Sequence, residues 1–168
     1  MQLSPSLRVE PLESRIAPAA VFIFTDTDGD KVTVKTSLGT DDELAAAGVL
    51  TFDLAADVPR QLQKIDLSNN ANFAGTDLTV TATRVGPGGD GVTAVGFIDA
   101  STSGGGAALD LGKITIDGDL GRILAGTGAA ATSVKTLAVG SLGLLGTATQ
   151  AAGGDLRSTL AGALGKLA

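Results

Sequence analysis

The stretch that decides the predicted fold is Gly-Asp-Leu-Gly-Arg-Ile at residues 118–123, because it recurs twice downstream. It returns as Gly-Ser-Leu-Gly-Leu-Leu at 140–145 and as Gly-Ala-Leu-Gly-Lys-Leu at 162–167, with a spacing of 22 residues between successive copies. A short segment that tolerates β-structure precedes each copy at the same offset. Such regular spacing indicates a repeat fold.

A unit of this length cannot bury its own apolar side, so the copies must stack on one another. Stacking would place the apolar residues of the copies in two interior ladders, Leu120, Leu142 and Leu164 in one and Ile123, Leu145 and Leu167 in the other. The glycines would lie at sharp turns and at close backbone approaches. We therefore predict a mainly all-β fold, a parallel β-solenoid (β-helix) with 22-residue coils, preceded by a β-hairpin and one short helix.

Two other repeat structures fit parts of this region. Short helices of small residues with glycine caps would suit 129–131 and 156–168, and this alternative stays open. A leucine-rich repeat consensus matches 62–70 and nearly matches 111–119. Because that match does not recur in the next two copies, we interpret it as a coincidence of strand-rich sequence.

Composition divides the chain into three regions. Residues 1–20 hold three of the five prolines and form a predicted extended leader, like a sorting segment. Residues 21–84 form a β-rich part with a hairpin, a short helix and the first coils. Residues 85–168 hold the solenoid repeats.

Within the second region, an apolar run at 21–24, an Asp-Gly turn and an alternating run at 31–36 predict a β-hairpin. Acidic residues at 41–43 followed by Gly48 predict a short helix over 41–48. Short strands are expected at 49–54, 62–67, 78–83 and 92–100.

Composition also limits the chemistry. The chain has no His and no Cys, which excludes an imidazole base, a thiol nucleophile, an ordinary zinc site and a disulfide. A net charge of −6 argues against nucleic acid and anionic membranes as partners. No apolar run approaches the roughly 18 residues that a membrane-spanning helix needs, and the N-terminus lacks the pattern of a standard signal peptide.

The best candidate site is the cluster Asp26, Asp28 and Asp30 in the hairpin turn. Carboxylates at alternate positions around a glycine can converge on a hard cation, so the cluster predicts a metal site with calcium as the ion. Lys31 and Ser37 stand where an EF-hand loop needs Gly and Glu, which excludes that motif. The alternative is an ordinary turn whose charges stay in water.

Other motifs predict no chemistry. The glycine-rich segment 86–91 lacks the Lys and Ser/Thr of a phosphate-binding loop and is expected to be a surface loop. The carboxylate pair Asp117 and Asp119 has no polar counterpart at the equivalent positions of the next two copies, and the acidic run at 41–43 is the other candidate. We therefore expect no catalytic residues and no enzymatic activity.

The segment from Leu7 to Pro18 resembles the Leu-Glu-Pro-Arg type leader of large secreted proteins from planctomycete and verrucomicrobial bacteria. The match covers Leu12-Glu13, Arg15 and Ile16, with Ser14 in place of proline. The Gly-Asp-Leu-Gly repeats look like the β-helical repeats of the same proteins. This resemblance implies a secreted or cell-surface protein.

Together these patterns favour a non-enzymatic structural or adhesion-type surface module built from stacked β-coils. Two alternatives stay open, namely a β-helix that binds or cleaves carbohydrate and a calcium-stabilised, adhesin-like module. The expected partners are a polysaccharide and a second copy of the chain, because the last coil would present an apolar, unpaired edge.

Overall fold

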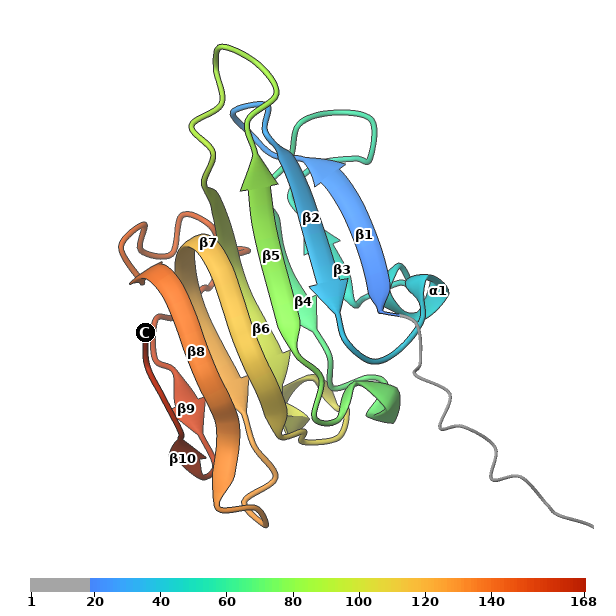
Figure 1. Ribbon diagram of the computed structural model, residues 1–168, viewed down its shortest axis with the longest axis vertical. Coiled ribbons are helices and arrows are strands. Elements are labelled where there is room, and N and C mark those ends of the chain that lie inside the picture. Colours follow the sequence, from blue (N-terminus) through green and yellow to red (C-terminus); the bar gives the residue numbers. More distant parts are fainter. Residues whose placement is uncertain (1–18) are drawn as a thin grey trace, which may run out of the picture.

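The computed structural model describes residues 19–168, and Figure 1 shows a single curled sheet. The leader resemblance at 7–18, and all but the last two residues of the predicted leader at 1–20, lie outside the described residues. The strands are β1 (Ala20–Thr25), β2 (Lys31–Thr36), β3 (Leu50–Phe52), β4 (Leu62–Asp66), β5 (Leu78–Thr83), β6 (Thr93–Ala100), β7 (Leu111–Ala125), β8 (Thr132–Leu142), β9 (Thr159–Leu160) and β10 (Ala163–Leu164). One α-helix, α1 (Asp41–Leu44), and two 3-10 turns, Ala71–Phe73 and Thr102–Gly104, complete the described residues.

The prediction of a mainly β fold is confirmed, and the sheet mixes two kinds of pairing. Antiparallel pairs join β1 to β2, β2 to β5 and β3 to β4. Parallel pairs join β4 to β6, β5 to β7, β6 to β7 and β7 to β8. The short β9 and β10 pair in parallel with β7 and β8. The two predicted regions, 21–84 and 85–168, therefore contribute strands to the same sheet.

The long strand β7 changes its neighbours half-way along. Residues 114–116 pair with β5 and residues 118–125 pair with β6, while β8 pairs along residues 111–120 and β9 pairs with Leu124 and Ala125. The change occurs at Gly118, whose φ is +149°. A Cβ there would overlap the carbonyl of Thr93, so only glycine lets the two backbones approach this closely. The predicted role of this glycine is confirmed.

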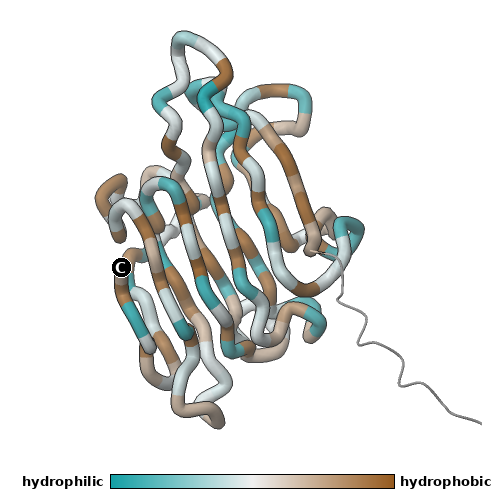
Figure 2. Tube along the Cα trace, in the orientation of Figure 1, coloured by the Kyte–Doolittle hydropathy of each residue, from teal (hydrophilic) through white to brown (hydrophobic). Residues whose placement is uncertain are grey.

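The concave side of the sheet encloses one apolar core. Figure 2 shows apolar and polar residues alternating along the strands, as expected when one face of each strand is buried. The largest fully buried side chains come from β2, β4, β5, β6 and β7 and from the connections between them. Both predicted regions contribute to this core.

Local patterns predicted the N-terminal elements well. The hairpin of β1 and β2 forms with Ala20 opposite Thr36 and Thr25 opposite Lys31. Helix α1 begins after Thr40, which forms a reciprocal capping box with Glu43, and it ends four residues earlier than the predicted Gly48. Strand β5 covers the predicted residues 78–83.

The prediction of two interior ladders is wrong. Leu120 and Ile123 are buried, but Leu142 and Leu145 are half exposed and Leu167 is 63% exposed. Copies one and two keep the 22-residue register only at Asp119 opposite Ser141 and Leu120 opposite Leu142.

The third copy does not stack on the second. Leu164 lies opposite Val134 and Leu167 opposite Leu137, so this copy lies beside the first part of β8. The reason is that β9 pairs with the end of β7 and not with the end of β8, which displaces the third copy from the expected register.

The two end strands of the sheet order, β1 and β3, meet through aromatic rings. The ring of Phe52 on β3 lies 4.9 Å from that of Phe24 and 6.0 Å from that of Phe22. The guanidinium of Arg60 covers Phe52 at 3.7 Å from the ring centroid. These contacts bring the ends of the curled sheet together.

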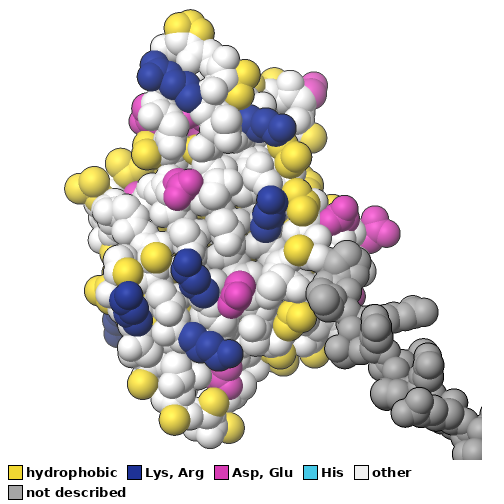
Figure 3. Space-filling view, in the orientation of Figure 1, with side chains coloured by type: hydrophobic (Ala, Val, Ile, Leu, Met, Phe, Trp, Pro, Cys, Tyr) yellow, Lys and Arg dark blue, Asp and Glu magenta, His cyan; other side chains and the backbone are white. Residues whose placement is uncertain are grey.

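The surface carries charged side chains of both signs. On the face seen in Figure 3, positive and negative side chains are interspersed among uncharged groups. None of the helices in residues 19–168 has the length and apolar content needed to cross a membrane.

Candidate functional site

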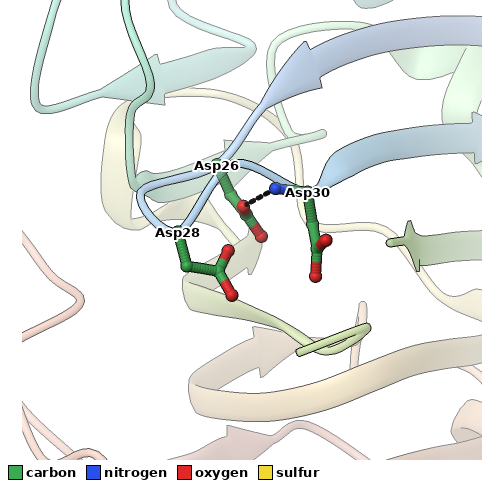
Figure 4. Close-up of side chains that lie close together, drawn as sticks. All are labelled: Asp26, Asp28 and Asp30. Atoms are coloured by element: carbon green, nitrogen blue, oxygen red, sulfur yellow. Dashed lines mark hydrogen bonds between the residues drawn. The ribbon is translucent and has the colours of Figure 1, made fainter. Parts of the chain in front are cut away.

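The three predicted aspartates lie together in the turn between β1 and β2. Their carboxylates each offer an oxygen, and these oxygens all lie within 4.8 Å of one another. The turn is held by the Asp30 amide, which donates to Asp26 Oδ1 at 2.8 Å, as Figure 4 shows. Gly29 has φ +99°, which lets the chain reverse between Asp28 and Asp30. The local sequence therefore builds a turn that points its carboxylates to one side.

The connection between β5 and β6 covers this turn, which the sequence did not predict. The Gly91 amide donates to Asp30 Oδ2 at 2.6 Å, and the Asp90 amide donates to Asp28 Oδ2 at 3.1 Å. A Cβ at Gly89 would overlap the Asp30 carboxylate. The glycines of this segment thus allow its backbone to lie directly against the aspartates, and the segment is more than a free surface loop.

One oxygen of the cluster, Asp30 Oδ1, has no protein partner. Asp30 is completely buried, yet its Oδ1 forms no hydrogen bond. Asp26 is also buried, whereas Asp28 is exposed. A buried carboxylate oxygen without a partner is costly, so this atom favours a cation beside it.

The electrostatics of the cluster agree with its geometry. Burial and the neighbouring Asp28 carboxyl raise the pKa of Asp26 to about 7. The contact with Asp26 lowers the pKa of Asp28, because the Asp28 carboxylate accepts a hydrogen bond from the Asp26 carboxyl. Two carboxyls in contact thus share one proton when nothing else neutralises them.

Asp26 and Asp28 border a pocket of about 460 Å³ between the hairpin, β6 and the turn after β8. Four of its lining residues are acidic, Asp26, Asp28, Asp90 and Asp119, and none is Lys or Arg. Positive charge to balance these carboxylates is therefore missing from the walls of the pocket. This arrangement favours a cationic occupant.

No protein-family model, curated protein or solved structure matches the chain. What the pocket binds therefore has to follow from its own chemistry.

The other acidic candidates have structural roles. Asp119 is buried and accepts hydrogen bonds from Ser141 Oγ at 2.6 Å and from the amides of Leu144 and Leu145. Its neighbour Asp117 is exposed. Asp119 therefore holds the turn that follows β8, since its oxygens are already engaged.

The acidic run at 41–43 also acts locally. Asp41 Oδ1 accepts from the Val21 amide, and Glu43 Oε2 accepts from the Thr40 amide at 2.8 Å. These carboxylates cap α1 and fasten it to the start of β1.

A second polar cluster, also missed from the sequence, lies at the ends of β4 and β6. Lys64 contacts both Asp66 and Asp99. Each aspartate also accepts from the serine two residues further on, Ser68 and Ser101 respectively. The shared Asp-x-Ser pattern is visible in the sequence, but only the strand register shows that the two copies meet.

Proposed function

We propose that the protein is a non-catalytic structural or adhesion-type surface module whose β-coils stack in parallel and act through their shape. The observation that carries this proposal is the run of parallel pairs from β4 through β6 to β7 and from β5 through β7 to β8. Parallel pairing of neighbouring strands over one core is what a stack of solenoid coils would require, and it supports the proposal. The antiparallel hairpin of β1 and β2 covers the N-terminal end of the stack.

The polar side chains at the turns support a structural role. Asp77 accepts from the Lys113 amide, Asp110 accepts from Thr127, and Asp119 accepts from Ser141 and the turn after it. Each of these hydrogen bonds joins one strand or turn to the next along the stack. The carboxylates thus stabilise the coil connections.

The C-terminal part supports self-association. Five large apolar side chains between residues 142 and 167 are exposed, Leu142, Leu144, Leu145, Leu156 and Leu167. Large apolar side chains left exposed in one part of the chain favour contact with another protein surface. The proposed partner is a second copy of the chain, and the proposed setting is the outside of the cell, in line with the leader resemblance.

Sedimentation velocity over a range of protein concentrations tests self-association. We expect the wild type to form larger species as concentration rises, and Leu144→Glu combined with Leu167→Glu to reduce them. Val85→Glu is the matched control, because Val85 is 68% exposed but lies in the connection after β5. A wild type that stays monomeric at about 100 μM would remove self-association from the proposal.

Carbohydrate binding or cleavage is the alternative that the pocket raises. Its lining includes Gln61, whose Nε2 already donates to the carbonyls of Leu62 and Ala94, and Asp119, whose oxygens are engaged as described. Because these groups are satisfied internally, the pocket supports a sugar ligand less well than a cation. A glycan array with a reducing-sugar assay decides the matter, since turnover of a polysaccharide would contradict the structural role.

A further inference from the structure

We propose that Asp26, Asp28 and Asp30 bind one Ca²⁺ beneath the 88–91 segment, and that this ion fastens the β1–β2 hairpin to the connection between β5 and β6. The hairpin aspartates were the predicted ligands. The role of the second segment, and the joining of two parts of the chain about 60 residues apart, come from the tertiary structure. The inference stands independently of the structural role proposed above.

The first step is the shape of the site. In Figure 4 the three carboxylates point to the same side of the turn. Their oxygens lie within 4.8 Å of one another, which is the spacing of atoms that share one ion. Two of them come from buried residues and are held by the backbone, so the site is largely formed before the ion binds.

The second step is the unsatisfied atom. The buried Asp30 Oδ1 has no hydrogen-bond partner although Oδ2 of the same carboxylate accepts from Gly91. The covering segment therefore satisfies one oxygen and leaves the other free. A cation among the three carboxylates would give that oxygen a partner.

The third step is charge. Asp90, whose amide contacts Asp28, lines the pocket together with Asp26 and Asp28, and the lining holds no Lys or Arg. Buried carboxylates without positive neighbours are expensive, and a divalent ion offsets that cost. The amides of residues 90 and 91 supply only partial positive charge.

The fourth step is the choice of ion. The donors are oxygen atoms only, which suits a hard cation. Ca²⁺ accepts six to eight oxygens in flexible geometry, and the exposed Asp28 leaves room for water to complete its shell. Mg²⁺ demands compact octahedral geometry and gives up water reluctantly, so we expect it to bind more weakly.

Calorimetric titration of the whole chain with CaCl₂, alongside thermal melts in EDTA and in CaCl₂, tests the site. At a Ca²⁺ concentration 100 times the dissociation constant, we expect Tm to rise by about 5–10 °C. Hydrogen exchange at the amides of Asp90 and Gly91 should slow when Ca²⁺ is added, because the ion holds that segment against the hairpin.

Asp30→Asn and Asp28→Asn should each weaken Ca²⁺ binding about tenfold or more, since affinity depends on the number of charged ligands. Asp28 is exposed, so its variant should fold even where the buried Asp30 variant does not. Asp57→Asn is the matched control, because it removes the same charge from an exposed residue in another loop. The control should keep wild-type affinity.

Three results would overturn the site. The first is a wild type whose Tm does not change at millimolar Ca²⁺. The second is an equal loss of affinity in the Asp28 variant and the Asp57 control, which would indicate general charge attraction. The third is Ca²⁺ binding without any slowing of exchange at residues 90 and 91, which would separate the ion from the fastening role.

Discussion

Asp66 and Asp99 lie opposite each other in the parallel pair of β4 and β6, and both carboxylates are almost fully buried. Two like charges in this position repel each other and lose hydration. The Nζ atom of Lys64 offsets both effects, since it lies 2.7 Å from Asp66 Oδ2 and 3.1 Å from Asp99 Oδ2. One lysine therefore stabilises the pairing of two neighbouring strands.

Replacing this lysine should destabilise the fold. We expect Lys64→Met to lower the free energy of unfolding by about 2–3 kcal/mol, because it leaves two buried carboxylates side by side without the positive charge that both contact. Urea denaturation measures the loss. Lys113→Met, at an exposed lysine of β7, should change the free energy by less than about 0.5 kcal/mol. Equal effects of the two substitutions would contradict the role of Lys64.

The same cluster predicts a loss of stability in acid. Burial acts to raise the pKa of Asp99, but hydrogen bonds from Ser101, Ser103 and Lys64 outweigh it and hold the pKa below its usual value. Such a carboxyl stabilises the folded state above its unfolded pKa of about 3.9. The contribution disappears as pH falls through the lower pKa of the folded state.

Thermal melts between pH 2 and pH 7 test whether stability falls as the pH is lowered. We expect Tm to fall below pH 4, and Asp99→Asn to flatten that fall, since the amide does not titrate. An unchanged slope in the variant would show that other carboxylates govern the transition.

The change of neighbouring strands at Gly118 in β7 predicts that this glycine cannot be replaced without loss of stability. We expect Gly118→Ala to cost at least about 2 kcal/mol, because φ is +149° and the new Cβ would meet the Thr93 carbonyl. Gly86→Ala is the control, since that residue has open space around it and no positive φ. The control should be neutral or stabilising by up to about 1 kcal/mol. Chemical denaturation of both variants measures the difference.

The aromatic contact between the ends of the sheet should also matter. Phe52→Ala removes the partner of Phe22, Phe24 and Arg60, and we expect it to cost about 2 kcal/mol. Ile23→Ala, at a half-exposed residue of β1, should cost less than about 1 kcal/mol. If the two variants unfold at the same urea concentration, the ring cluster does not close the sheet.

Short-range patterns predicted much of the local structure. The alternation in 31–36 and 78–83, the Asp-Gly turn and the acidic start of the helix at 41–43 each depend on residues a few positions apart, so one short stretch of chain is enough to predict them. The candidate aspartates could also be predicted from a short stretch of sequence, because the turn between two paired strands is enough to bring them together.

The repeat was harder to interpret. Equal spacing in sequence sets the register only when each copy stacks on the one before it. Here residues 143–158 connect β8 to β9. Strand β9 pairs with the end of β7, and the third copy then pairs with the first part of β8 instead of its end. Leu142 and Leu145 consequently remain at the surface although they match the buried Leu120 and Ile123.

By itself, the sequence determined the β-rich class, the hairpin, the short helix that begins at Asp41 and the carboxylates of the candidate site, because each depends on local backbone preference and alternation. Only the tertiary structure decided which strands became neighbours, that residues 88–91 cover the aspartates, and that Lys64 joins Asp66 to Asp99. The physical reason is that such contacts join residues far apart in the chain. They form when the whole sheet closes over its core, so no local pattern encodes them.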